Sequence, residues 1–360
     1  ASTTNLANAG PDALAPGGIG DTLRRCGIAV VAPSREASRI EWSKAFAKEL
    51  MAEAGVPTAA WHAYPDAAAA RAALEQRDGP VVVKADGLAA GKGVVVAGDR
   101  AEALAALGTP GVGGGAVVLE DVLEGPEASL QALVDGDTVV ALPPARDHKR
   151  AGDGDTGPNT GGMGAVSPAG VLPDDEAQGL ADALIAPVAR ALAARGTPFR
   201  GVIFAGLIRT AAGWQVLEYN ARFGDPEAEV TLPRLEGDFG RLMQALGEGR
   251  LAEHVAATPL RFSPRAVVDV VLCAEGYPGT PRRGDLIEGL DALPEGVYAM
   301  HGGTRRARGG IVTAGGRVLH IVGTGDTVAE ARQRAYAGAE QVRFRGKFYR
   351  SDIAVSGSGA

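Results

Sequence analysis

Cysteine is nearly absent from this chain of 360 residues, which contains only Cys26 and Cys273. The two lie far apart in the sequence, so a disulfide framework and cysteine-based zinc spacing are excluded. The five histidines show no paired metal-binding spacing either. No apolar run approaches the ~20 residues of a membrane span, and residues 1–18 lack the basic and apolar regions of a signal peptide. These absences predict a soluble, cytoplasmic protein in a reducing setting.

Lysine is also scarce, because only six of the 36 basic residues are lysines and the rest are arginines. In such a chain a lysine is expected where a compact ammonium group is needed, although a solvated surface position is an equal alternative. The formal net charge of −7 disfavours a general nucleic-acid-binding surface. The lysines are Lys44, Lys48, Lys84, Lys92, Lys149 and Lys347.

Glycine (52) and proline (22) together make up about a fifth of the chain, and they indicate many turns and loops that let the backbone approach a ligand. Hydrophobic residues (46%) and charged residues (22%) occur in the proportions of a folded globular protein. A chain of this length exceeds one compact core, so two or three domains are expected. The composition therefore favours a multidomain enzyme that acts on small molecules.

Hydrophobic periodicity and cap residues predict a mixed α/β chain followed by a strand-rich α+β section after residue 264. The expected helices cover residues 20–25, 34–40, 42–54, 66–76, 100–107, 174–194 and 328–341. The expected strands cover residues 28–31, 81–84, 94–97, 116–119, two segments within 129–142, 201–209, 214–219, 266–274, 296–300, 308–313 and 318–323. Residues 145–168 are expected to form a long polar loop.

Residues 81–96 place a glycine-rich stretch between two apolar strands. A Walker A loop needs four residues between its first glycine and Gly-Lys-Ser/Thr, followed by a helix. Here three residues separate Gly87 from Gly91, and a strand follows Gly93. The pattern predicts a flap between antiparallel strands whose N–H groups cover a triphosphate, with Lys84 pointing to the same phosphates. A flexible hairpin tip is the alternative.

The expected strand 214–219 leads into a polar run that ends at residue 227. A strand's period of two puts Glu218 and Asn220 on one face, where carboxylate and amide oxygens suit Mg²⁺ shared with phosphates. Arg222 continues on that face while the backbone stays extended, and there it can bind an anionic transition state or an acyl phosphate. An edge strand with a solvated polar face is the alternative.

Two other segments carry many polar residues. Residues 147–164 combine glycines with alternating acids and bases, and long irregular loops are usually functional or disordered. An EF-hand is excluded because residues 153–155 lack a spaced third ligand and a terminal glutamate. Residues 117–127 could present backbone groups to adenine and carboxylates to a ribose, although a solvated acidic turn explains that segment better when it is viewed alone.

In this order, these segments resemble the ATP-grasp superfamily and, within it, the phosphoribosylamine–glycine ligase family, also called glycinamide ribonucleotide synthetases. The likeness extends from about residue 34 to residue 353. The flap points only to the superfamily, whereas the runs 147–164 and 220–227 are specific to the ligase family. Residues 43–48 and 274–279 also match the family.

The resemblance implies a multidomain α/β and α+β protein with an ATP-grasp fold, a partial Rossmann-like N-terminal domain and a small C-terminal α+β domain. Its implied boundaries are 1–59 for the partial N-terminal domain, 60–123 for the ATP-grasp lid, 124–262 for the ATP-grasp core and 263–355 for the C-terminal domain. A monomer is favoured over an obligate oligomer, without a nucleic-acid or membrane partner.

The implied reaction joins glycine to 5-phosphoribosylamine through glycyl phosphate, and it gives glycinamide ribonucleotide, ADP and phosphate. ATP would be the co-substrate, with Mg²⁺ or Mn²⁺ bound by Glu218 and Asn220. Nucleotide binding is implied for Lys44, Lys84, Ala89, Ala90, Gly91, Lys92, Gly93, Glu120, Val122 and Glu127. Catalysis, by orienting glycine and the reactive intermediate, is implied for Lys149, Asp153, Asp155 and Arg222.

One departure concerns the front of the chain. Family members open with a strand and a glycine-rich turn that helps to bind the phosphate of phosphoribosylamine, and no such motif stands here. We therefore expect the start of the N-terminal domain to be missing and strand 28–31 to lack its sheet neighbours. Three readings remain: the ligase, an ATP-binding protein with impaired or lost ligase activity, or a ligase for another carboxylate. The run 147–164 argues against the third.

Overall fold

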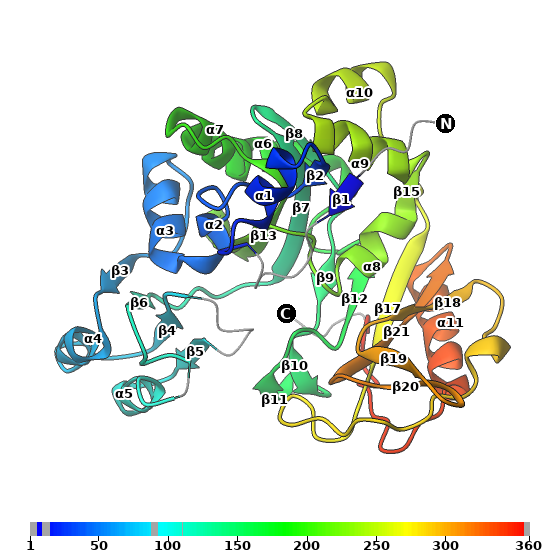
Figure 1. The fold of residues 1–360 in the computed structure, drawn as a ribbon. Helices are drawn as coiled ribbons and strands as arrows, with labels where there is room; N and C mark the ends of the chain where they lie inside the picture. Colours follow the sequence, from blue (N-terminus) through cyan, green and yellow to red (C-terminus); the bar gives the residue numbers. More distant parts are fainter. Residues whose placement is uncertain (1–5, 9–14, 88–92, 110, 356–360) are drawn as a thin grey trace. The chain divides into compact units, whose positions relative to one another are not determined.

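The computed structural model describes residues 6–8, 15–87, 93–109 and 111–355, and the chain forms two compact units (Figure 1). Unit 1 comprises Ala1–Leu142, Asp175–Phe223 and Gly237–Leu260. Unit 2 comprises Pro143–Asp174, Gly224–Glu236 and Arg261–Ala360. Each unit is made of three separate stretches of the sequence, so the units do not test the boundaries of the four contiguous domains, which stay predictions. Among the described residues, no helix is both long and apolar enough to span a bilayer.

The first part of unit 1 contains a short parallel pair of strands and three helices. Strand β1 pairs with β2 in parallel in a two-stranded sheet, so strand 28–31 has one sheet neighbour among the described residues, and the expectation that its usual neighbours are missing stays a prediction. The predicted helices 34–40 and 42–54 are also wrong in their bounds, because Ser43 is extended and caps the second helix by accepting the N–H of Phe46. The bounds are β1 Leu6–Asn8, α1 Ile19–Arg25, β2 Ala29–Val31, α2 Arg39–Trp42 and α3 Lys44–Glu53.

A four-stranded antiparallel sheet follows in unit 1, with the strand order β3-β6-β4-β5. Alanines and leucines of α4 and α5 pack against valines of β4 and β6 to form its core. The antiparallel pairing of β4 with β5 confirms that strands flank the glycine-rich stretch, while residues 88–92 lie outside the described residues. The bounds are β3 Trp61–Tyr64, α4 Ala67–Leu74, β4 Val81–Ala85, β5 Val94–Ala97, α5 Arg100–Ala106 and β6 Val117–Glu120.

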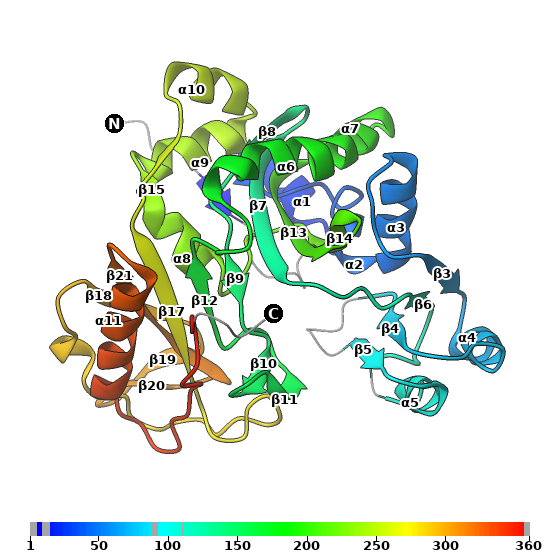
Figure 2. The same cartoon turned by 180° about the vertical axis from the view of Figure 1, so that it is seen from behind.

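A second antiparallel sheet of unit 1 has the order β14-β13-β7-β8, and α6 packs beside β7 and β8 (Figure 2). The single helix predicted for 174–194 is wrong. The helix is interrupted at Ile185, and Pro187 lies in the first turn of the second helix. Helices α9 and α10 were not predicted. The bounds are β7 Glu127–Asp135, β8 Thr138–Ala141, α6 Ala177–Leu184, α7 Ala186–Ala194, β13 Arg200–Thr210, β14 Gly213–Asn220, α9 Phe239–Glu248 and α10 Leu251–Ala257.

Unit 2 is built on a five-stranded sheet with the order β18-β21-β17-β12-β9. The prediction of a long irregular loop over 145–168 is wrong, because four short strands form there and two of them join this sheet. The sheet strands are β9 Arg146–Asp147, β12 Gly164–Ser167, β17 Ala266–Cys273, β18 Val297–His301 and β21 Arg317–Gly325. The antiparallel pairs are β10 Arg150–Gly152 with β11 Thr156–Asn159, β15 Leu235–Glu236 with β16 Arg261–Phe262, and β19 Thr304–Ala307 with β20 Gly310–Thr313.

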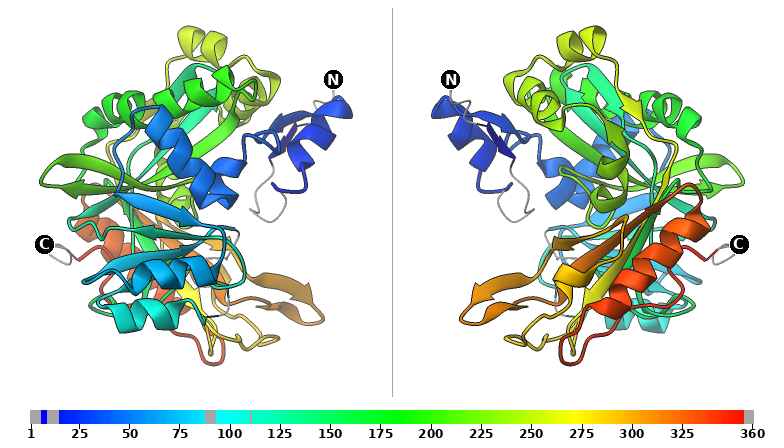
Figure 3. Two further views of the ribbon diagram at one scale, coloured as in Figure 1. Left: turned by 90° about the vertical axis from the view of Figure 1, so that its left-hand side faces the viewer. Right: turned by 90° about the vertical axis from the view of Figure 1, so that its right-hand side faces the viewer.

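Different helices cover the two faces of this sheet. Helix α11 (Val328–Gln341), which has its predicted bounds, packs alanines on one face (Figure 3). Gly323 allows this close approach, since a Cβ there would lie 2.4 Å from the carbonyl oxygen of Ala331. Helix α8 (Ala228–Thr231) packs Val230 on the other face. The remaining short helices are η2 Asp174–Glu176, η3 Leu232–Arg234 and η4 Leu290–Ala292.

Candidate active site

The metal-binding residues predicted for unit 1 lie at the end of β14. A bulge between the pairs Gly206–Glu218 and Leu207–Val216 interrupts the register of β13 with β14. Tyr219 is buried and donates its hydroxyl to the carbonyl of Leu184, whereas Glu218 and Asn220 are half-buried. The alternation of a strand therefore separates the apolar side from the polar side, as the sequence predicts.

Lys44 lies against the predicted metal ligand Glu218. Its Nζ donates to Oε2 of Glu218 at 2.9 Å. Burial opposes the charge on Lys44, but Glu218, Glu41 and Glu120 outweigh this effect and raise the pKa of Lys44. The lysine is the first residue of α3, whose start is held by a hydrogen bond from the Ala45 N–H to Asp86 at 3.1 Å. Local helix capping thus positions a permanent cation beside the carboxylate.

Glu120 lies between two lysines in the interior of unit 1. Its Oε2 accepts a hydrogen bond from Lys48 at 2.8 Å, and its Oε1 forms an ion pair with Lys84 at 2.9 Å. Lys48 also donates to Thr58 at 2.7 Å, and Lys84 donates to the carbonyl of Leu217 at 3.1 Å. The side chains of Lys48 and Glu120 are each only 2% exposed.

Sequence reasoning assigned no role to Lys48. Burial and the neighbouring Lys84 lower the pKa of Lys48 to about 8, although Glu120 opposes that shift. Its position four residues after Lys44 places both ammonium groups on one side of α3, and the scarcity of lysine was the available signal. The pair Lys84–Glu120 links β4 to β6, and Lys48–Glu120 links both to α3. These ion pairs do not test whether Glu120 contacts adenine, so that contact stays a prediction.

Arg222 contacts both Asn220 and a second missed residue, Glu41 of α2. The Nε of Arg222 lies 3.0 Å from Glu41 Oε1, and its Nη2 donates to Asn220 Oδ1 at 3.1 Å. Glu41 also accepts the N–H of Ala221 at 3.0 Å. The Nδ2 of Asn220 is buried and finds no hydrogen-bond partner among the residues that the structure describes. Glu41 carries no sequence signal, because its burial results from the packing of α2 on β14.

The other predicted nucleotide contacts of unit 1 that the structure describes lie at or near the ends of strands β5, β6 and β7. Gly93 accepts the N–H of Ala85 at 2.7 Å and closes the described part of the flap. Val122 is half-buried after β6, and Glu127 is exposed at the start of β7. The predicted contacts Ala89, Ala90, Gly91 and Lys92 lie outside the described residues. The roles of all these residues stay predictions.

In unit 2, the predicted catalytic residues Asp153 and Asp155 lie at the turn between β10 and β11. Asp153 accepts hydrogen bonds from the N–H and the hydroxyl of Ser351. Asp155, whose φ is +53°, pairs with Arg350 at 2.7 Å. Arg350 also holds Asp352, and its hydrogen bonds keep the pKa of that carboxyl well below its usual range. These aspartates therefore anchor the hairpin to the C-terminal segment, and their catalytic role stays a prediction.

Lys149 and His148 occupy the strand end before this hairpin. The carbonyl of Lys149 accepts both the N–H and the hydroxyl of Thr160 at 2.8 Å. His148 is buried, and its Nε2 accepts the N–H of Ala354 at 3.4 Å. Burial, together with Arg146 and Arg350, lowers the pKa of His148 to about 4. His148 is therefore a neutral packing residue near neutral pH.

We expect His148 to make unit 2 sensitive to acid. The unfolded chain binds a proton on this imidazole below its ordinary pKa of 6.5, whereas the folded chain does not until about pH 4. Stability should therefore fall as the pH drops from 6.5 to 4, by about 3 kcal/mol from this residue. Urea unfolding from pH 7 to pH 4.5 tests this. The free energy of unfolding should depend less on pH in His148→Gln than in the wild type, whereas the exposed control His62→Gln should behave as the wild type does. Equal slopes of this free energy against pH in the wild type and both variants would contradict the assignment.

Comparison with known proteins gives matches over nearly the whole chain. Residues 42–228 match the family described as phosphoribosylglycinamide synthetase, ATP-grasp (A) domain, and residues 267–356 match its C domain. A phosphoribosylamine–glycine ligase from Mesorhizobium japonicum is 45% identical over 355 residues, which are 97% of this chain and 83% of that protein.

Solved structures show the same likeness. The phosphoribosylamine–glycine ligase structure from Thermotoga maritima has a TM-score of 0.79 and 38% identity, and the match covers 90% of this chain and 82% of that chain. The biotin carboxylase domain of the Hydrogenobacter thermophilus 2-oxoglutarate carboxylase, solved with MgADP, ADP and bicarbonate, has a TM-score of 0.72. At 20% identity, over 96% of this chain and 75% of that chain, this second match supports the fold alone.

Proposed function

The chain belongs to the phosphoribosylamine–glycine ligase family, and we propose that Glu218, Asn220, Lys44 and Lys84 of unit 1 bind its metal–ATP complex. The protein is an ADP-forming ligase of purine biosynthesis with an ATP-grasp fold. We propose that it uses ATP together with a divalent cation. The alternative of an ATP-binding protein without ligase activity is not favoured, because the matched relatives are ligases over nearly the full length of this chain.

The observation that carries the assignment of the metal site is the half-buried pair of oxygen donors on one side of β14. A carboxylate at Glu218 and an amide at Asn220 are the donors that Mg²⁺ and Mn²⁺ prefer, and both metals fit this set. A bound ion would neutralise phosphate charge. Lys44 can exchange its present partner Glu218 for a phosphate oxygen, and Lys84 approaches from β4. The flap over 87–93 would cover the phosphates, with Glu120, Val122 and Glu127 toward the nucleoside.

In the proposed reaction, a carboxylate oxygen of glycine attacks the γ-phosphorus of ATP, the bond from that phosphorus to the β–γ bridging oxygen breaks, and glycyl phosphate and ADP are formed. The amine of 5-phosphoribosylamine then attacks the acyl carbon, loses a proton and expels phosphate. Arg222, held beside Asn220 and Glu41, is the cation placed to hold the acyl phosphate. Lys149, Asp153 and Asp155 of the run 147–164 would orient glycine and the reactive intermediate, as the resemblance implies. Exclusion of water would protect the acyl phosphate.

Positional isotope exchange in ATP tests which carboxylate is activated. With Mg²⁺ and no phosphoribosylamine, glycine should move label between the bridging and non-bridging oxygens of the β-phosphate at least about tenfold faster than alanine or serine. The choice of glycine follows from the family, whose matched members are named as glycine ligases. Faster exchange with alanine or serine would overturn the choice of glycine, and the amino-acid-free reaction is the blank.

We further propose a cytoplasmic monomer. The two free thiols, Cys26 and Cys273, suit a reducing compartment. Among the described residues, the large hydrophobic side chains that are exposed lie on separate segments and form no single run along the chain: Val96, Phe239, Leu286 and Val355. Sedimentation at micromolar concentration would test the oligomeric state.

A further inference from the structure

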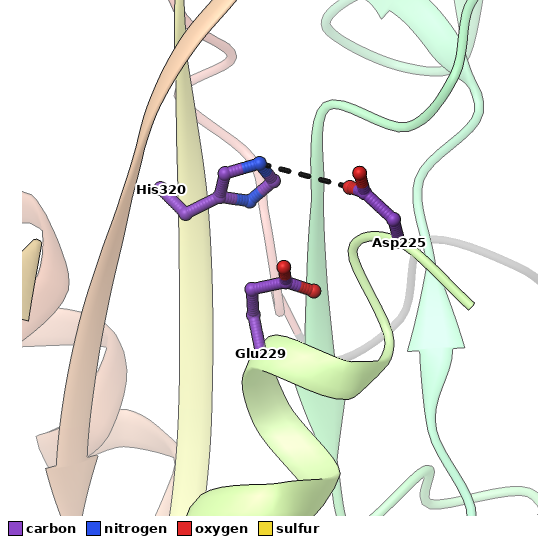
Figure 4. Close-up of side chains that lie close together, drawn as sticks. All are labelled: Asp225, Glu229 and His320. Atoms are coloured by element: carbon purple, nitrogen blue, oxygen red, sulfur yellow. Dashed lines mark ion pairs between the residues drawn. The ribbon is translucent and has the colours of Figure 1, made fainter. Parts of the chain in front are cut away.

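Three potential metal ligands from different segments meet in unit 2, on the face of the five-stranded sheet that α8 covers. Asp225 lies before α8, Glu229 lies on α8, and His320 projects from β21 (Figure 4). One oxygen or nitrogen atom of each residue lies within 4.8 Å of the others. The Nε2 of His320 lies 3.6 Å from Asp225 Oδ1. The three side chains therefore converge on one point.

A fourth residue orients the imidazole. The Nδ1 of His320 lies 2.7 Å from Oδ2 of Asp269, which stands on the neighbouring strand β17. His320 is 3% exposed and Asp269 is fully buried. A carboxylate on the second nitrogen of a histidine is the usual support of a metal-binding imidazole, because it fixes the ring and turns the other nitrogen toward the ion. Asp269 turns Nε2 toward Asp225 and Glu229 in this way.

Buried polar atoms around this point have unfilled hydrogen-bonding capacity. Oε2 of Glu229, Oδ1 of Asp269 and the hydroxyl of Tyr298 are each buried and have no hydrogen-bond partner within the described part of the chain. Arg317 supplies one guanidinium, which pairs with Asp225 Oδ1 at 2.6 Å. Three carboxylates face one imidazole and one guanidinium, and unpartnered buried oxygens are costly, so a further cation would satisfy the group.

We propose that Asp225, Glu229 and His320 form a second divalent-cation site, suited to Zn²⁺ and separate from the metal–ATP site of unit 1. One imidazole nitrogen with two carboxylate oxygens suits a borderline ion, whereas Mg²⁺ prefers oxygen ligands alone. Bonds of about 2.0 Å in a tetrahedron put ligands about 3.3 Å apart, so small side-chain rotations close the present spacing. A bound ion would join α8 to β21. This inference does not depend on the proposed function.

The site is tested by Zn²⁺ binding to the full chain in excess Mg²⁺, which is there to occupy oxygen-only sites. Isothermal titration should show one equivalent of Zn²⁺ per chain. Both His320→Gln and Glu229→Gln should weaken it at least thirtyfold, because each removes one of three protein ligands. The control is His301→Gln, an exposed histidine on the neighbouring strand β18. It should bind Zn²⁺ as the wild type does.

Two further measurements distinguish a built site from weak surface binding. Zn²⁺ should raise the melting temperature of the wild type and of His301→Gln, but not of Glu229→Gln, which keeps the shape of the side chain. Co²⁺ in place of Zn²⁺ should give visible absorption bands of a low-symmetry site, and these should vanish in His320→Gln. Equal Zn²⁺ affinity in wild type and His320→Gln, or no stoichiometric binding by the wild type, would overturn the proposal.

Discussion

Replacement of Glu218 by alanine is expected to lower ligase turnover about 10³-fold, which corresponds to about 4 kcal/mol of transition-state stabilisation. The variant loses the charged ligand of the proposed metal pair and leaves Lys44 without its partner at 2.9 Å. Calorimetry should show that ATP affinity no longer rises when Mg²⁺ is added. Steady-state release of ADP measures the turnover.

The comparison between metal-free and metal-bound ATP separates loss of the metal site from loss of the fold. Without Mg²⁺, Glu218→Ala should bind ATP at least as tightly as the wild type, because a negative charge near the phosphates is gone. The control is Glu253→Ala, which removes an exposed carboxylate on α10 and should leave both measurements unchanged. If Glu218→Ala bound Mg-ATP as the wild type does, the assignment of the metal site would be wrong.

Glu120→Ala is expected to destabilise the folded protein by about 3–5 kcal/mol, because it leaves the buried ammonium groups of Lys48 and Lys84 without their shared carboxylate. Urea unfolding at pH 7 measures the loss. Glu120→Gln keeps the volume of the side chain but not its charge, so its free energy of unfolding should lie between those of the wild type and Glu120→Ala. Glu124→Ala, which removes an exposed carboxylate near the end of β6, is the matched control.

The loss in Glu120→Ala should shrink as the pH rises. Burial already lowers the pKa of Lys48 to about 8, and removal of Glu120 lowers it further, so the folded variant can release this proton while the unfolded chain retains it. Because the unfolded state then binds more protons, the stability of the variant relative to the wild type rises with pH. A destabilisation that is unchanged between pH 7 and pH 9.5 would show that the uncompensated charge of Lys48 is not its cause.

The short-range pattern of the sequence was enough to predict the strongly periodic elements. Helix α11 has its predicted bounds, because Thr327 caps it and small residues recur at helical spacing. The strands around the glycine-rich stretch and the pair β13–β14 also agree with their apolar runs. The face shared by Glu218 and Asn220 followed from strand periodicity. The resemblance then supplied the family, which the comparisons confirm.

Residues 145–168 show where local pattern fails. Strands β9 and β12 contain two and four residues, so they have little propensity of their own. Strand β12 pairs with β17, about a hundred residues later, and β9 pairs in turn with β12. The prediction of a helix that runs through Ser43 failed for another reason. A serine within a helical pattern can cap a new helix as readily as continue the old one.

The sequence by itself determined the family and the chemistry class, and it predicts the residues that would bind phosphate and metal, because these depend on residue types at fixed short spacings. Only the tertiary structure decided which charges meet across long separations. Lys48 meets Glu120 from another element, Glu41 meets Arg222, and His320 meets Asp225 and Asp269. Such pairs have no sequence spacing to reveal them, since their partners are set by how helices pack on strands and by the register of strands within the sheets.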